Sequence, residues 1–252
     1  MAKPDTLDGS KLKITVAGLS DVGLMRSENQ DRLFISKDKR ILVVADGMGG
    51  HNGGSVASQL FVDWFETESK VKGPGLVNRK SIKTWSNRVV TQANAEIYKW
   101  GRTELDLWGM GTTGVVLIVG DDFVHCAHVG DSRIYRVRKG KLLQLTKDHS
   151  AVQDLIDSGD MREEERKGHP RSHIVTRFVG DVSVNVEHHA YKWQEGDLYL
   201  LASDGLTDIV EDAYIESVMA SQMNVKRMCA ELVDRVLVSG APDNVTVLIA
   251  SL

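Results

Sequence analysis

Short hydrophobic runs rich in β-branched residues recur along the chain, and Gly, Asp or Asn bounds each of them. Runs of this length and composition are typical of β-strands. Several are separated by only two to four turn residues, which allows antiparallel pairing but not a parallel crossover. The pattern predicts strands at about residues 13–19, 32–36, 41–45, 112–119, 123–129, 133–138, 141–145, 184–190, 197–203 and 244–250.

Helical periodicity occurs in two pairs of segments, 55–69 with 81–100 and 212–219 with 224–239. Strands in runs with helices in pairs favour antiparallel sheets covered by helices. Many of the strands have apolar residues on both faces, as expected if two sheets stack and the helices cover the outside.

Composition narrows the class of protein. The 252 residues are 42% hydrophobic and 26% charged, with a net charge of −4, which argues against a nucleic-acid or membrane-surface binder. Two distant cysteines give neither a disulfide framework nor a zinc spacing. No apolar run approaches a membrane span, and the first residues lack the apolar stretch of a signal peptide. Without a Pro- or Ser-rich linker, we expect a flexible tail over residues 1–12 and one domain over 13–252.

Four predicted strands meet an aspartate at a tight turn. Asp46, Asp131 and Asp204 each follow the end of an apolar run, and Asp243 precedes the start of another. A single junction of this kind indicates no more than a turn, because Asp-Gly and Asp-Asn are common turn sequences. Four at strand ends exceed what turns require. If the strands share sheet edges, these carboxylates converge.

Converging carboxylates repel one another and raise each other's pKa unless a cation neutralises them. The set contains only oxygen ligands, without cysteine or a histidine cluster, and it therefore favours a hard ion such as Mg²⁺ or Mn²⁺. Gly47 directly follows Asp46. Because Gly47 has no side chain, its backbone can approach an ion and offer its carbonyl.

Two further segments have features that suit phosphate. Residues 47–54 form a Gly-rich run ahead of a predicted helix, and such loops can hold phosphate on backbone N–H groups. The run lacks the P-loop and dinucleotide patterns, so a flexible turn explains it equally well. Arg26 and Asp31 stand five residues apart ahead of a strand, and the arginine fork suits phosphate oxygens. From the local sequence alone, a surface arginine near a surface aspartate is the simpler interpretation.

Seven segments taken together resemble the metal-dependent serine/threonine phosphatases of the PPM (type 2C) family, in its compact bacterial form. Each is weak evidence alone, but they occur in the family's order with nearly its spacing, and the match runs from about residue 13 to the C-terminus. The resemblance implies an α+β fold, a four-layer α/β/β/α sandwich of two stacked antiparallel sheets flanked by helix pairs. The segments are residues 23–31, 44–51, 111–114, 128–135, 145–149, 203–208 and 243–244.

The resemblance also implies a set of metal ligands. Asp46 is similar to the carboxylate that bridges two core ions, and Gly47 to the residue whose backbone carbonyl binds the second ion. Asp204 and Asp243 would complete the coordination of the first ion. Asp131, together with Asp204, resembles the ligands of a third and looser ion in bacterial members.

The remaining roles follow from the same resemblance. Asp31 would act mainly through metal-bound waters, and Arg26 would bind the substrate phosphate. Hydroxide bridging the two Mn²⁺ or Mg²⁺ ions would attack phosphorus in line, without a phosphoenzyme. His51 is the nearest candidate by sequence to protonate the leaving group, with a metal-bound water as the alternative. Gln30 replaces a Glu common in the family, which excludes a carboxylate ligand there. Residues 149–172 resemble the family's flap, and their charges are either a solvated face or help to select substrates.

The implied function is that of a bacterial protein serine/threonine phosphatase in signal transduction, acting on phosphoserine and phosphothreonine proteins. A catalytically silent scaffold that binds phosphoproteins is the alternative, against which the full set of aspartates argues. A two-metal nucleotidyl transferase or cyclase is a third interpretation, which no nucleotide or triphosphate motif supports. We expect a cytoplasmic monomer without nucleic-acid or membrane partners, whose substrates include a cognate serine/threonine kinase.

Overall fold

The strands form two antiparallel sheets in a computed structural model that describes residues 13–50, 53–72, 78–166 and 168–252. The tail predicted over residues 1–12 lies outside the described residues. One sheet has the order β1-β11-β10-β7-β8, and the other β2-β3-β5-β6-β9 with β4 paired to β3. The strands are β1 (Thr15–Asp21), β2 (Asp31–Ile35), β3 (Ile41–Met48), β4 (Gly111–Thr112), β5 (Gly114–Val119), β6 (Phe123–Val129), β7 (Arg133–Arg138), β8 (Lys141–Gln144), β9 (Glu187–Lys192), β10 (Leu198–Ala202) and β11 (Val245–Ser251).

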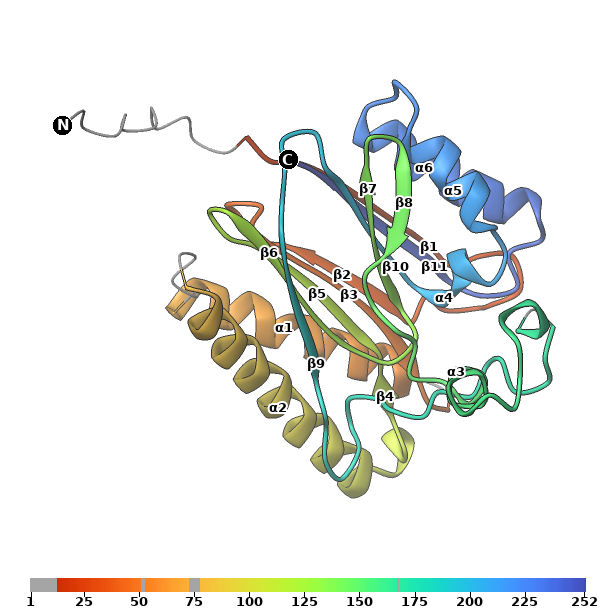
Figure 1. Ribbon diagram of the computed structural model, residues 1–252. Helices are drawn as coiled ribbons and strands as arrows, with labels where there is room; N and C mark the ends of the chain where they lie inside the picture. The colour runs from red at the N-terminus through yellow and green to blue at the C-terminus, as the bar shows by residue number, and fades with distance from the viewer. Residues whose placement is uncertain (1–12, 51–52, 73–77, 167) are drawn as a thin grey trace.

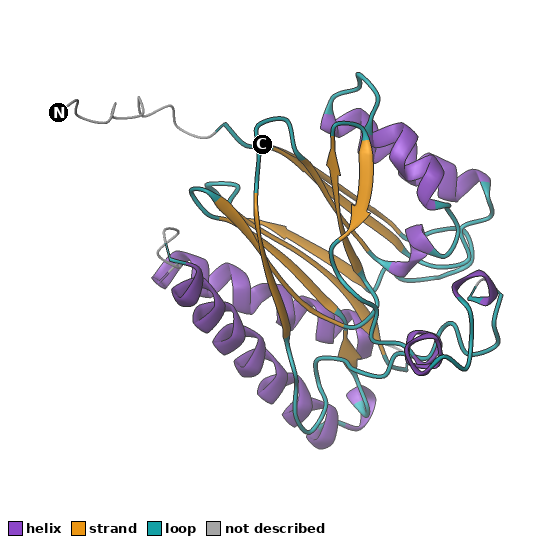
Figure 2. Ribbon diagram, viewed as in Figure 1, coloured by secondary structure: helices purple, strands orange, loops and turns teal. Residues whose placement is uncertain are grey.

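Helices cover the outer face of each sheet, as Figure 1 shows. The long helices α1 (Gly53–Lys72) and α2 (Arg79–Thr103) lie on the β2-β3-β5-β6-β9 sheet. The helices α5 (Asp212–Met219) and α6 (Val225–Val238) lie on the other sheet, preceded by the single turn α4 (Asp204–Thr207). The two layers of strands between two layers of helices stand out in Figure 2. The four-layer sandwich expected from the sequence is therefore confirmed.

Three apolar layers hold the sandwich together. Alternation along β3 separates two of them: Val43 and Ala45 pack under α1 and α2, while Leu42 and Val44 face the opposite sheet. The third layer packs α5 and α6 on the β10 and β11 side, with Leu232 fully buried. Because the central strands are buried on both faces, their sequences are apolar at successive positions, which is the pattern that predicted stacking.

The predicted flap segment forms a separate excursion beside the end of the sandwich, at α3 in Figure 1. It contains α3 (Ala151–Ser158) and the 3-10 turn η2 (Glu163–Glu165). Ser150 caps α3 by accepting the Gln153 N–H, and Gly159 ends it in the left-handed region at φ 82°. A second 3-10 turn, η1 (Leu105–Leu107), follows α2. None of the helices within the described residues is long and apolar enough to cross a membrane.

Candidate metal centre

Asp31 and Asp46 face one another across a strand pair. They are directly opposed in the β2–β3 register, at the end of that pair. Opposed residues in an antiparallel ladder have Cβ atoms about 5 Å apart, so the two carboxylates share one location. Asp31 is 2% exposed, and its Oδ2 accepts the Ser203 hydroxyl at 2.8 Å. Ser203 immediately precedes α4, and this bond links the two sheets.

The other three aspartates reach the same end of the sandwich from neighbouring elements. Asp131 follows β6, Asp204 opens α4 after β10, and Asp243 precedes β11. Since β10 and β11 are antiparallel, the end of one lies beside the start of the other. Charge interactions connect Asp46 with Asp31, Asp204 and Asp131. The convergence expected from the strand-end positions is what the structure shows.

Two threonines fix the backbone at Asp46. Its carbonyl accepts the Thr112 hydroxyl and the Thr113 N–H, both at 2.8 Å, and its N–H donates to Thr113 Oγ1 at 3.1 Å. Thr113 Oγ1 also lies 2.7 Å from Ser132 Oγ, next to Asp131. Thr113, directly after β4, therefore joins the positions of Asp46 and Asp131 through one set of hydrogen bonds.

Glycine is required where chain segments cross within the site. A Cβ on Gly47 would lie 2.0 Å from the carbonyl oxygen of Gly54, at the start of α1. A Cβ on Gly205 would lie 1.8 Å from the carbonyl oxygen of Asn244, ahead of β11. Contacts this short exclude any side chain. In each Asp-Gly pair, the glycine thus allows the backbone next to the aspartate to lie against a second element.

The cluster carries more negative charge than its surroundings compensate. Burial, followed by the charges of Asp31 and Asp204, raises the pKa of Asp46 well above its usual range. Burial is likewise the main cause that raises the pKa of Asp31 to about 6 and that of Asp204 to about 6. Burial, and next the charge of Asp204, raises the pKa of Asp131. Repulsion of this kind is relieved when a cation sits among the carboxylates.

One buried oxygen in the cluster lacks a partner. Asp31 Oδ1 is inaccessible to solvent and makes no hydrogen bond within the described residues. Buried carboxylate oxygens are normally satisfied, so an orphaned one indicates a missing water or ion. The ligands at hand are carboxylates and the Gly47 carbonyl, the oxygen set that Mg²⁺ and Mn²⁺ prefer. The residues present therefore fit divalent cations.

A cavity of about 660 Å³ opens over the cluster. Arg26 lies at this cavity with its side chain 55% exposed and donates to Asp243 Oδ2 at 2.7 Å. The hydrogen bond to Asp243 is the main cause that raises the Arg26 pKa. The cavity thus places a positive fork directly beside a group of carboxylates.

Asn244 holds the loop that carries Arg26. Its Oδ1 accepts the Gln30 N–H at 2.8 Å, and its Nδ2 donates to the carbonyls of Val22 and Glu28, each at 2.9 Å. The side chain does not orient Asp243; the Asn244 backbone N–H does so, at 2.8 Å from Asp243 Oδ1. No local sequence pattern indicates these loop contacts, because they join residues more than 200 positions apart.

The positions of the predicted site residues can now be compared. Asp31, Asp46, Asp131, Asp204 and Asp243 come together, and Arg26 and Gly47 line the same cavity. His51 lies outside the described residues. Gln30 also lines the cavity.

Sequence reasoning missed part of the cavity wall. His173, Val175 and Phe178 line it from the far end of the flap, and Glu28 lines it from the Arg26 loop. The predicted flap range 149–172 stops just short of these three residues. Only the proximity of the flap motif to the site could have indicated them.

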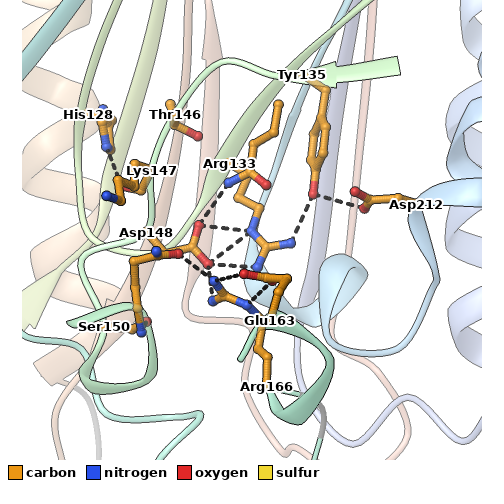
Figure 3. A network of polar contacts seen from close by, with 12 residues as sticks. His128, Arg133, Tyr135, Thr146, Lys147, Asp148, Ser150, Glu163, Arg166 and Asp212 are labelled. Atoms are coloured by element: carbon orange, nitrogen blue, oxygen red, sulfur yellow. Dashed lines mark hydrogen bonds and ion pairs between the residues drawn. The ribbon is translucent and has the colours of Figure 1, made fainter. Parts of the chain in front are cut away.

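A polar network fixes the near end of the flap to the sheet. Arg133 on β7 holds Asp148 through its Nε and Nη2, the latter at 2.6 Å, and Arg166 reaches the same carboxylate from beyond α3 at 3.3 Å (Figure 3). Arg133 also meets Tyr135, whose hydroxyl points at Asp212. Asp148 thus accepts hydrogen bonds from two arginines, one on β7 before the flap and one within the flap.

Comparison with known proteins identifies relatives of this arrangement. The protein phosphatase 2C family matches residues 26–239. The chain is 37% identical over 239 residues to the serine/threonine phosphatase stp of Listeria innocua, covering 91% of this chain and 92% of that protein. The serine/threonine phosphatase of S. agalactiae aligns with a TM-score of 0.89 and 32% identity, covering 95% of this chain and 100% of that one. The catalytic domain of PstP, solved with two manganese ions, aligns with a TM-score of 0.84 and 35% identity, covering 94% and 97%. The chain belongs to the protein phosphatase 2C family.

Proposed function

We propose that this serine/threonine phosphatase hydrolyses phosphoserine and phosphothreonine in proteins with two divalent ions, Mn²⁺ or Mg²⁺, held at the aspartate cluster. The observation that carries the proposal is the convergence of five carboxylates from both sheets, one of which, Asp31, has a buried oxygen without a partner among the described residues. That set suits hard cations and little else. A silent scaffold would not require it, and the relatives are named phosphatases.

The family resemblance supplies the ligand roles. Asp46, the Gly47 carbonyl, Asp204 and Asp243 would hold the two core ions, and Asp131 with Asp204 would hold a further, looser one. Asp31 does not line the cavity and would act through water. When bound, such ions would lower the pKa of water and polarise phosphoryl oxygens, so that water attacks phosphorus and the serine or threonine oxygen leaves.

Arg26 is the residue of this chain that binds the phosphate. Its planar fork can donate two parallel hydrogen bonds to phosphoryl oxygens, and it already lies at the mouth of the cavity. In the absence of substrate the guanidinium pairs with Asp243. A phosphate therefore competes with that carboxylate for the fork.

The two cysteines and Ser203 are poor candidates for a nucleophile that forms a covalent intermediate. Cys126 and Cys229 are buried, and burial raises the pKa of each thiol to about 12. Ser203 donates to Asp31 and accepts the Thr246 N–H, so its hydroxyl is fully engaged. Direct attack by water is consistent with both facts. His51 remains our prediction for protonation of the leaving alkoxide.

The biological setting is part of the proposal. Phosphoproteins are the substrates, and a cognate serine/threonine kinase is among them. We expect a cytoplasmic monomer whose residues 13–252 act as one catalytic domain.

The test uses the full chain with a phosphothreonine peptide and with p-nitrophenyl phosphate. We expect hydrolysis of both with Mn²⁺, loss of activity in EDTA, and recovery when Mn²⁺ is restored. Full activity in chelator would contradict the role of the cluster. Binding of the peptide without turnover in Mn²⁺ or Mg²⁺ would instead favour the silent scaffold.

A further inference from the structure

His149 and Gly130 are joined by two hydrogen bonds in opposite directions. The Gly130 N–H donates to His149 Nδ1 at 3.1 Å, and the His149 N–H donates to the Gly130 carbonyl at 3.0 Å. Gly130 directly precedes Asp131, whereas His149 begins the flap. The pair therefore connects the loop of a carboxylate in the cluster with the segment that lines the substrate cavity.

The first of these bonds fixes the tautomer of His149. Because Nδ1 accepts an N–H, it carries no proton, and the proton of the neutral ring sits on Nε2. Nε2 lies 3.2 Å from Glu187 Oε2, which accepts that proton. Burial is the largest cause that lowers the pKa of His149, which favours the neutral ring. Glu187 is held in turn, with its Oε1 2.7 Å from His189 Nε2.

The same geometry argues against a metal ion at this place. His128, His149 and Glu187 offer ligand atoms within 4.8 Å of one another, a spacing that could hold an ion. An ion on His149 Nε2 would need the proton moved to Nδ1. That proton would then point at the Gly130 N–H. The histidine is therefore committed to the hydrogen bond.

The turn at Gly130 has little freedom of its own. Its φ is 105°, and a Cβ there would lie 2.7 Å from Thr113 Cβ. Thr113 in turn holds the Asp46 backbone and Ser132. On one side the turn rests against Thr113; on the other, His149 accepts its amide.

The start of the flap is equally fixed. Lys147 O accepts from His128 Nε2 at 2.9 Å, and Asp148 lies between Arg133 and Arg166, as Figure 3 shows. The His149 carbonyl accepts the Thr176 N–H at 2.8 Å, and Ser150 bridges to Val175. Both ends of the flap thus meet at His149, whose partner Thr176 is two residues before Phe178 in the cavity wall.

We propose that His149 is a positioning residue that couples the flap to Asp131 by accepting the Gly130 amide. It touches neither substrate nor ion and acts through the Asp131 turn. The proposal rests on the proposed function, because it takes Asp131 as a ligand of a divalent ion.

Two substitutions separate the hydrogen bond from the bulk of the ring. In His149→Asn, the Oδ1 atom occupies nearly the place of Nδ1 and can still accept the Gly130 N–H. In His149→Gln, the amide replaces Nε2, retains a donor for Glu187, and leaves the Gly130 amide without an acceptor. We expect kcat to fall about tenfold or more in the Gln variant and to stay within about threefold of the wild type in the Asn variant. Equal losses in both variants would overturn the proposal.

A double-mutant cycle tests the route through Asp131. In an Asp131→Asn background, His149→Gln should change kcat by no more than about twofold, because the group on which it acts is already altered. Additive losses would mean that His149 acts elsewhere and would contradict the proposal.

An NMR measurement that does not depend on enzymatic activity tests the hydrogen bond separately from the proposed function. In protein labelled with ¹⁵N-histidine and ¹⁵N-glycine, we expect His149 in the wild type to carry its proton on Nε2, with a slowly exchanging Gly130 amide. Exchange should quicken in the Gln variant alone. A proton on Nδ1 in the wild type would refute the proposal without any variant having to fold. A wild type that hydrolyses nothing in Mn²⁺, with these signals intact, would refute the proposed function instead.

Discussion

At the residue scale, the site consists of buried carboxylates whose charged forms are destabilised by burial and by one another. Asp46 is the clearest case, because burial and two neighbouring carboxylates raise its pKa well above the usual range. Such a group reduces stability unless a cation is present, and groups with strongly shifted pKa values are typical of functional sites. The stability and the activity of this chain should therefore respond in opposite directions when that charge is removed.

Asp46→Asn tests this opposition. We expect kcat for p-nitrophenyl phosphate to fall at least about a hundredfold. The cation-free protein should at the same time unfold about 2–4 °C higher, the shift that about 1 kcal/mol gives in a chain of this size. Activity assays and thermal unfolding in EDTA measure the two effects. Asp122→Asn, in the exposed turn between β5 and β6, should change neither.

Arg26→Ala separates binding from turnover. Because the guanidinium is proposed to hold the phosphate in the ground state as well as in the transition state, we expect KM to rise about tenfold while kcat changes less. Arg26→Lys should recover only part of the loss, since it keeps the charge without the fork. An unchanged KM would remove Arg26 from the phosphate site. Arg40→Ala, which breaks the ion pair with Asp121, is the matched control.

At the element scale, the loops matter more than the strands for the shape of the site. The Arg26 loop has no regular structure of its own, and Asn244 holds it by three hydrogen bonds from the start of β11. Backbone groups that lose such a partner become unsatisfied, at about 1–3 kcal/mol each when buried. The loop and the strand therefore act as one element.

Asn244→Ala should loosen that element. We expect a loss of about 2–3 kcal/mol in the free energy of unfolding together with a raised KM, because Arg26 loses its fixed position. Asn224→Ala removes the N-cap of α6 instead and should cost about 1 kcal/mol with KM unchanged. Urea unfolding and steady-state kinetics on both variants distinguish a local role of Asn244 from a general loss of stability.

The contact of β6 with α2 and β9 adds a pH dependence. His125 is buried, with its Nε2 3.1 Å from His188 Nδ1. Burial, and next the charge of His188, lowers its pKa to about 3. Its folded pKa thus lies below the unfolded value of about 6.5. The stability from the neutral ring is present above that value and is lost as the pH falls toward the folded pKa.

His125→Gln should therefore reduce the slope with which the free energy of unfolding falls at acidic pH. The wild type should lose up to about 1.4 kcal/mol per pH unit through this histidine between pH 6 and 4. The variant should lack that share of the slope, which urea unfolding at stepped pH measures. The exposed His173→Gln serves as the control. Equal slopes in the wild type and the His125 variant would show that the ring is not kept neutral.

Elements and sites differ in how far the sequence predicts them. The short apolar segments 123–129 and 133–138 match the bounds of β6 and β7, because burial selects apolar residues along the strand. The helix α3 was not predicted, because it has only eight residues and only Val152 within it is buried. The convergence of the aspartates follows from their strand-end positions. The partners of Asn244 and His149 do not, because hydrogen bonds between distant segments leave no local pattern.

At the scale of the whole molecule, the cluster depends on the stacking of the two sheets. Asp31 and Asp46 lie in strands of one sheet, and Asp131 follows a strand of that sheet. Asp204 and Asp243 adjoin strands of the other sheet. Between the sheets lies an apolar layer that includes Leu248 and has no direct contact with the cavity. Small changes in that layer shift one group of carboxylates against the other.

Leu248→Ala tests this dependence. Truncation of a buried leucine costs about 2–5 kcal/mol. We expect Leu248→Ala to weaken Mn²⁺ binding measured by calorimetry as well as stability. Leu232→Ala, in the layer between α6 and its sheet, removes the same atoms and should lower stability with Mn²⁺ affinity nearly unchanged. Equal affinities in the two variants would show that the layers are not coupled to the cluster.

A site divided between two layers cannot function in a half-assembled chain. If only one sheet has formed, during synthesis or after partial denaturation, only the three carboxylates of one sheet or the two of the other are in place. Neither group alone should bind a divalent ion tightly. On the proposed function, a nascent or damaged copy should therefore not hydrolyse phosphoproteins until its two halves have assembled, and divalent ions should then stabilise the assembled form.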